Sequence, residues 1–177
     1  MKHLFTLAAL ALGLAASQAS AHASFAESEV VQGQTARLTL RVPHGCAGEA
    51  TLRLRISIPD GLAAVQPMVH AGWTLDTVTG PLAQPYTAHG RTVTEGVREI
   101  IWTGELPAAF YDEFVFRATV TDMLPVGEML YIPAIQECAN GVERWIEIPA
   151  AGQDSHDLED PAPGVMVVAP GDHGHGH

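Results

Sequence analysis

Lysine is almost absent from this chain of 177 residues: Lys2 is the only one. Nine basic residues in all stand against 20 aspartates and glutamates, a formal net charge of −11. So few cationic side chains cannot form the Lys and Arg clusters that contact nucleic-acid phosphates. We therefore expect no nucleic-acid partner, repulsion from anionic lipid, and attraction of cations.

Long hydrophobic runs are also missing, with one exception at the start of the chain. An apolar stretch from Leu4 to Ala16 follows Lys2 and gives way to small residues. It is shorter than the roughly 20 apolar residues that span a bilayer. A charged start, a short apolar run and an A-x-A exit are typical of a secretory signal peptide. The sequence thus predicts a leader over residues 1–21, no transmembrane anchor, and a periplasmic or otherwise secreted protein.

The exit from the leader reads "ASAHASF" (19–25). We favour cleavage after Ala21, which makes His22 the first residue of the exported protein; triplets ending at Ala19 and Ala23 are alternatives. Cleavage removes Lys2, so eight arginines would face the 20 acidic residues, a formal charge of −12. The roughly 155 residues that remain suit a single domain and a tail.

Cysteine is scarce as well, with only Cys46 and Cys138 in the chain. An even count in an exported protein favours one disulfide between them. The alternative is a thiol pair for Cu(I), but an oxidising compartment and the lack of a C-x-x-C spacing argue against it.

Where hydrophobic residues do occur, they alternate with polar ones. The pattern runs through "TARLTLRV" (35–42), "TLRLRISI" (51–58) and "EFVFRATV" (113–120), with turn residues between such segments. Period-two alternation is typical of half-buried antiparallel strands, and a sustained helical period is missing from residues 22–150. We therefore predict an all-β fold, an immunoglobulin-like antiparallel β-sandwich over residues 22–150.

The segment "VERWIEIP" (142–149) has an informative phase. In an extended strand Val142, Ile146 and Ile148 share one face, which we expect to be the core face. Trp145 lies on the opposite face between two glutamates. Its indole then covers a second layer or a loop, or belongs to a site.

After Pro149 the chain becomes acidic and rich in Pro and Gly, so we expect residues 151–177 to be a linker and a flexible, His-rich C-terminal tail. "VMVVAP" (165–170) leaves open an additional edge strand. The last residues, "GDHGHGH" (171–177), are a short metal-attracting sequence.

Several motifs in order resemble the YcnI-like copper-binding proteins of the bacterial envelope. They are a histidine directly after the leader, "RVPHGC", "ISIPDGL", "IIWTGELPAAFYDEFVF", and "QEC" followed by a tryptophan. The resemblance covers residues 22–149. It implies a β-sandwich that binds Cu(II) through the amine and ring nitrogens of one N-terminal histidine and through a carboxylate, with a tryptophan against the metal.

Carried over to this sequence, these roles fall on His22, Glu49 and Trp145, with Glu27 and Glu29 as other candidate acids. A chelate of amine and imidazole suits Cu(II), which heads the affinity order of divalent ions. The disulfide would bring the loops that carry Glu49 and Trp145 to one end of the sandwich.

The leading hypothesis is therefore a copper-binding protein, not an enzyme, that stores, buffers or transfers Cu(II), with other envelope copper-transport or chaperone proteins as partners. One alternative is a histidine-brace copper oxidoreductase, which would need a second histidine at the metal. Another is an exported module that binds a protein and no metal. His44, beside Cys46, leaves two alternatives: a surface loop histidine, which we favour, and a position close to the site. We assign no role to His70 or His89.

Overall fold

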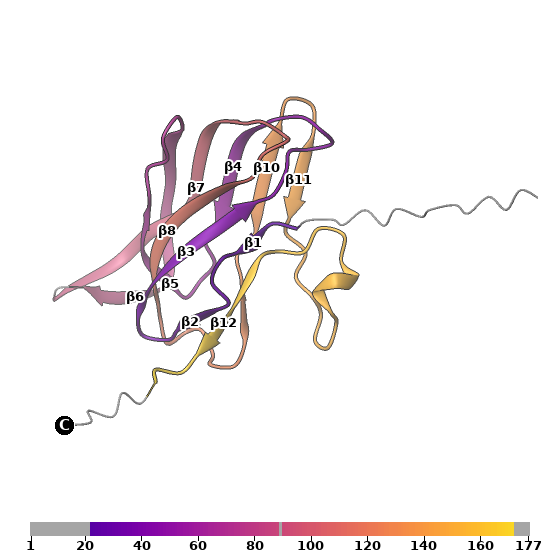
Figure 1. The fold of residues 1–177 in the computed structure, drawn as a ribbon. Coiled ribbons are helices and arrows are strands. Elements are labelled where there is room, and N and C mark those ends of the chain that lie inside the picture. Colours follow the sequence, from indigo (N-terminus) through magenta and orange to yellow (C-terminus); the bar gives the residue numbers. More distant parts are fainter. Residues whose placement is uncertain (1–21, 89, 172–177) are drawn as a thin grey trace, which may run out of the picture.

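The computed structural model describes residues 22–88 and 90–171 and consists almost entirely of β-strands (Figure 1). The predicted leader, His89 and the tail from 172 to 177 lie outside the described residues. No helix among the residues described is long and apolar enough to cross a membrane.

Two antiparallel sheets form the sandwich, which confirms the predicted all-β, antiparallel class. The first sheet has the order β1-β3-β8-β5 and comprises β1 (Ser24–Phe25), β3 (Thr35–Val42), β8 (Asp112–Val120) and β5 (Leu62–Pro67). The second has the order β11-β10-β4-β7-β6 and comprises β11 (Val142–Trp145), β10 (Ala134–Cys138), β4 (Thr51–Ser57), β7 (Arg91–Leu106) and β6 (Thr74–Ala88).

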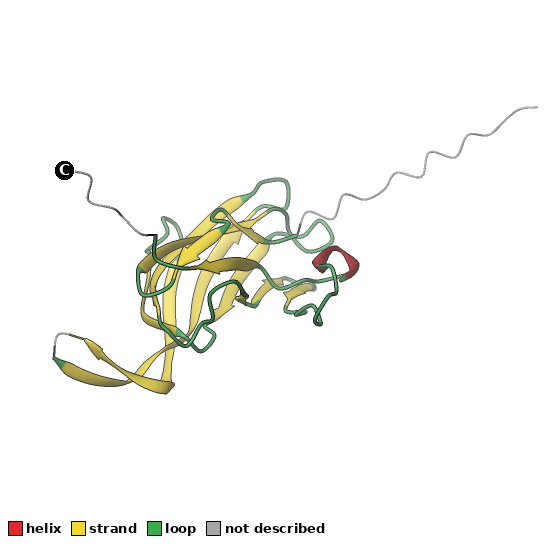
Figure 2. Ribbon diagram, turned by 90° about the horizontal axis from the view of Figure 1, so that it is seen from below, coloured by secondary structure: helices red, strands yellow, loops and turns green. Residues whose placement is uncertain are grey.

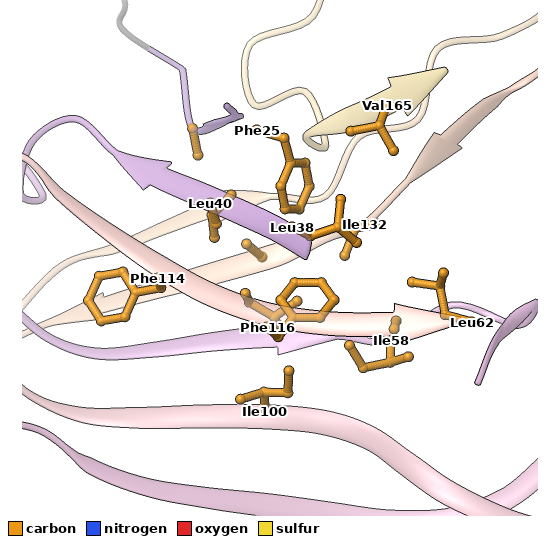
Figure 3. Packing of buried hydrophobic residues seen from close by; sticks show 14 of the residues in the cluster. Phe25, Leu38, Leu40, Ile58, Leu62, Ile100, Phe114, Phe116, Ile132 and Val165 are labelled. Carbon is orange, nitrogen blue, oxygen red and sulfur yellow. The ribbon is translucent and has the colours of Figure 1, made fainter. Parts of the chain in front are cut away.

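The core lies between the inner faces of these sheets. Leu38 and Leu40 of β3 and Phe114 and Phe116 of β8 are fully buried, as the alternation predicts. Figure 3 shows their side chains with Ile100 of β7 and other members of the same cluster. The long β6–β7 hairpin continues past this core and projects from the sandwich (Figure 2).

The predicted alternation fails at the start of β4. Leu52 is exposed and Thr51 is buried, because the pairing of β4 with β7 shifts register between Thr51 and Arg53. A bulge of this kind adds a residue to one strand and changes which side chains face inward. The hydroxyl of Thr51 is thereby placed inside the sandwich, where it accepts a hydrogen bond described below.

The prediction that residues 151–177 form a linker and tail is wrong for its middle part. The segment η1 (Ser155–Asp157) is a single 3-10 turn, and β12 (Gly164–Val168) lies between β2 (Glu29–Val31) and β9 (Met129–Tyr131) in a third, small sheet. Val165 and Val167 of β12 are buried in the core. The open alternative of an added strand is the correct one, and the folded domain extends to Val168.

Ending the chain at Ala150 should therefore destabilise the domain strongly. Two buried valines alone contribute roughly 3–6 kcal/mol, and the exposed edges of β2 and β9 add to the loss. Urea unfolding of chains that end at Ala150 and at Gly171 measures the difference. The chain that ends at Gly171 should match the full-length protein; equal stability of the shorter chain would mean that β12 does not belong to the core.

Candidate functional site

The first described residue, His22, is placed by the pairing of β1 with β3. Ser24 is opposite Arg41 in this antiparallel register. Continued by two residues, the register puts His22 opposite Pro43, next to His44. Directly opposite residues have α-carbons about 4.5–5.5 Å apart. The start of β1 and the end of β3 therefore bring two histidines close together.

Polar contacts after β1 hold this end of the chain on the sheet. The backbone N–H of Ala26 donates to the carbonyl of Thr39 at 2.9 Å. The carboxylate of Glu27 accepts from the backbone N–H of Thr39 at 2.7 Å and from its hydroxyl at 2.9 Å. Arg37 lies 3.7 Å from the same carboxylate. Glu27, one of the candidate acids, is thus engaged in anchoring β1, and Glu29 lies exposed at the start of β2.

Both histidine rings pack edge-on against the indole of Trp145. The ring centroids of His22 and Trp145 are 5.9 Å apart, and those of His44 and Trp145 are 6.1 Å apart. Trp145 is 2 % exposed, whereas both histidines are half-buried. One buried aromatic side chain therefore forms a wall shared by two partly accessible imidazoles.

The predicted phase of residues 142–149 is wrong. Trp145 belongs to the core cluster, while Ile146 is 42 % and Ile148 is 59 % exposed. The reason is the register of β11 with β10: Trp145 is opposite the buried Ala134 and shares its inward face, whereas Val142, at the start of β11, is 42 % exposed. After Trp145 the strand ends and the chain leaves the sheet. The backbone N–H groups of Ile146 and Glu147 donate to the carbonyl of Asp160, 3.1 and 3.0 Å away. The indole is thus both part of the core and in contact with the histidines.

A buried amide, Gln136, connects these groups. Its side-chain oxygen accepts from the indole N–H of Trp145 at 3.3 Å, and its NH₂ donates to the hydroxyl of Thr51 at 2.7 Å and to the carbonyl of His44. Gln136 is fully buried, and every buried side-chain polar atom among the described residues has a partner. The sequence does not indicate this residue, because a glutamine in a strand carries no signal for burial.

The predicted disulfide between Cys46 and Cys138 is present, with an α-carbon separation of 6.0 Å. It ties the loop after β3 to the end of β10. A link between residues 92 apart stabilises a folded domain by about 2–4 kcal/mol. His44 is only two residues from this link, so its backbone has little freedom.

The structure does not bring Glu49 to His22 and Trp145. The carboxylate of Glu49 accepts two hydrogen bonds of 2.8 Å from Asn140, one from its side-chain amide and one from its backbone N–H. Asn140 lies in the β10–β11 turn, whereas Trp145 is at the far end of β11 (Figure 1). Three residues from Val142 to Trp145 alone span roughly 10 Å. The expectation that the disulfide places Glu49 and Trp145 at one end of the sandwich is therefore wrong.

These hydrogen bonds, first the one from the side chain of Asn140, lower the pKa of the Glu49 carboxyl. A lowered pKa means that the contact stabilises the folded state above the ordinary pKa of the group. The stabilisation is lost as the pH falls through the lowered value. At neutral pH the Glu49 carboxylate therefore holds its loop to the β10–β11 turn.

His70 is held apart from this cluster. The Nε2 of His70 is 2.9 Å from the carboxylate of Asp112, and its ring lies 4.8 Å from that of Phe114. His156, in η1, lines a shallow hollow together with His22 and Glu27. Across residues 22–88 and 90–171, no three His, Cys, Asp or Glu side chains gather closely enough to hold a metal ion. A metal at this place would need the terminal amine as well as the imidazoles.

These observations define an immunoglobulin-like, all-β domain with a cluster of His22, His44 and Trp145 at one edge. The chain belongs to the family described as domain of unknown function DUF1775, which matches residues 22–167. No curated protein matches the sequence.

Among solved structures, an uncharacterized protein from Nocardia farcinica, described as having an immunoglobulin-like fold, aligns with a TM-score of 0.59 and 22% identity. The alignment covers 83% of this chain and 98% of that one, and it shows the fold. AvmM, which catalyzes macrocyclization in alchivemycin A biosynthesis, also aligns, over 84% of this chain and 82% of its own. Its TM-score of 0.28 and its identity of 12% are too low to indicate a shared fold.

Replacing Gln136 by Leu should lower the free energy of unfolding by about 1–3 kcal/mol for each buried group it leaves unpaired. The indole N–H of Trp145 and the carbonyl of His44 would both lose their partner. Gln66→Leu is the matched control, because Gln66 is exposed and makes one hydrogen bond, to Arg117. Chemical denaturation measures both variants; equal losses would mean that the buried amide has no special part in holding the cluster.

Proposed function

We propose that this protein is exported and binds Cu(II) at its new N-terminus, in order to store, buffer or transfer the ion. The observation that carries the proposal is the contact between the rings of His22 and Trp145, with centroids 5.9 Å apart. The resemblance to YcnI-like proteins supports it, and so does the family match, which begins at His22.

Cleavage after Ala21 would free the α-amine of His22. The amine and Nδ1 of the same residue can then close a six-membered chelate ring on one ion. Both nitrogens bind a metal in their deprotonated form, and metal binding itself releases the protons. Nitrogen donors of this kind suit Cu(II) above the other divalent ions of the first transition row.

The position of the Trp145 indole determines whether such a site would hold copper or use it in a reaction. A buried indole beside the imidazole keeps water away from one side of the ion, and its π face attracts cations. Exclusion of water and substrate from that side favours holding copper over reacting with it.

Glu49 is the least supported member of the site. Both of its oxygens accept hydrogen bonds from Asn140 and would have to give these up to reach a metal. We therefore propose His22 and Trp145 as the members of the copper site. Glu49 instead holds its loop to the β10–β11 turn through Asn140.

The disulfide supports an extracytoplasmic location, because such bonds persist in oxidising compartments. The acidic surface supports a cationic cargo. Partners would be other envelope proteins that deliver or receive copper.

A second candidate is the copper oxidoreductase with a histidine brace, which the ring of His44, 6.1 Å from Trp145, favours. The two functions are separated by incubating the copper-loaded protein with ascorbate and a polysaccharide. A copper-holding protein should give no oxidised sugar products, whereas an oxygenase should release them.

An extra residue before His22 should weaken Cu(II) binding by roughly 100-fold or more, since loss of a supporting group outside the ligand set already costs about 10–100-fold. The extension moves the amine out of chelating reach. Competition titration with a Cu(II) chelator measures the change. Deleting residues 172–177 is the control and should leave the strong site unchanged; if the tail deletion removes it, copper binds at the tail histidines instead.

Copper should also quench tryptophan fluorescence through Trp145. Cu(II) quenches at short range, so Trp145→Phe should abolish most of the decrease, although the buried variant should lose about 1–3 kcal/mol of stability with its hydrogen bond to Gln136. Trp73 and Trp102, both packed against Phe114, serve as internal references. Undiminished quenching in Trp145→Phe would place the ion elsewhere.

A further inference from the structure

We infer that His44 is a direct ligand of the same ion, through its Nε2, so that the site contains two imidazoles and the amine of His22. The inference rests on the proposed copper site and names its ligand set. The same set is the histidine brace of the second candidate, so the assay with ascorbate and a polysaccharide still separates the two functions. It replaces the expected carboxylate by a third nitrogen.

The first argument is position. The register of β1 and β3 pairs Ser24 with Arg41, and its continuation by two residues leads to His22 on one chain segment and Pro43, the residue before His44, on the other. Both imidazoles then lean against one indole, with centroids 5.9 and 6.1 Å from that of Trp145. Two half-buried rings, from the neighbouring ends of β1 and β3, thus contact the same indole.

The second argument is the proton on the imidazole. Nδ1 of His44 lies 2.8 Å from the carbonyl oxygen of Gly45. A carbonyl oxygen only accepts, so Nδ1 carries the proton of the neutral ring. Nε2 is therefore left with its lone pair free. Histidines that bind metals donate their other N–H to a carbonyl or carboxylate in this way, which sets the tautomer and the ring orientation.

The third argument is rigidity. The side-chain NH₂ of the buried Gln136 donates to the backbone carbonyl of His44. The side-chain oxygen of the same residue accepts from the indole N–H of Trp145. Two residues later, Cys46 is tied to Cys138. The ligand and the wall are thus positioned by one shared amide, and little conformational entropy is lost when an ion binds.

The fourth argument is that the candidate carboxylates already accept hydrogen bonds from other residues. Glu49 is bound by Asn140 at the β10–β11 turn, and Glu27 is bound by Thr39. Among the described residues, no Asp or Glu joins the two histidines in a group of three. A set of three neutral nitrogens remains, which suits the tetragonal preference of Cu(II).

The test uses protein that begins at His22, with and without His44→Gln. The variant should bind Cu(II) roughly 100-fold more weakly, the upper end of what the loss of a supporting group costs. His156→Gln is the matched control, since His156 lines the hollow beside His22, and Glu49→Gln tests the carboxylate. Both should bind as the unaltered protein does. Circular dichroism and the melting temperature of the metal-free variants show that each is folded.

Pulsed electron paramagnetic resonance of the unaltered copper protein counts the imidazoles without any substitution. Two coupled imidazoles support the inference, and one overturns it. Unchanged affinity in His44→Gln together with weakened binding in Glu49→Gln would restore the carboxylate site and leave the proposed function intact. If the protein that begins at His22 and the one with an added residue bind copper equally, the proposed function itself fails.

Discussion

The pairing of a two-residue strand, β1, with β3 is the constraint on which the site depends. Ser24 and Phe25 are its only members, yet they place the chain at His22 on the edge of a rigid sheet. Phe25 is buried in the core, and the Glu27 carboxylate holds Thr39 of β3. His22 is thereby held beside a buried tryptophan.

Behind this edge, one fully buried side chain sets the relative positions of the other groups. The side chain of Gln136 forms hydrogen bonds with three groups: the indole of Trp145, the hydroxyl of Thr51 and the carbonyl of His44. A buried amide with all its partners in place specifies a single arrangement, because any displacement leaves a polar group unpaired. The disulfide at Cys46 restrains the same loop from its other end. Contacts within the protein thus hold the cluster in one arrangement.

Local patterns in the sequence predict the sandwich but only part of the site. The alternation of apolar residues identifies β3, β8 and most of β4, and the two cysteines identify the disulfide. Contacts distant in sequence decide the rest. Trp145 points inward because the register of β11 places it opposite the buried Ala134 of β10. The residues after it leave the sheet and donate to the carbonyl of Asp160. Asn140 holds the carboxylate of Glu49 at the β10–β11 turn, and the ring of His44 lies against Trp145. Both contacts join residues about 90 or more positions apart, and no local pattern predicts them.

The most direct test of the central claim is the N-terminus of the protein recovered from outside the cytoplasmic membrane. Intact mass together with N-terminal sequencing shows which bond the signal peptidase cuts. The account predicts a mature chain that begins at His22, with the amine free and next to the ring that faces Trp145. A chain that begins at Ser24 lacks the histidine altogether and would contradict the account.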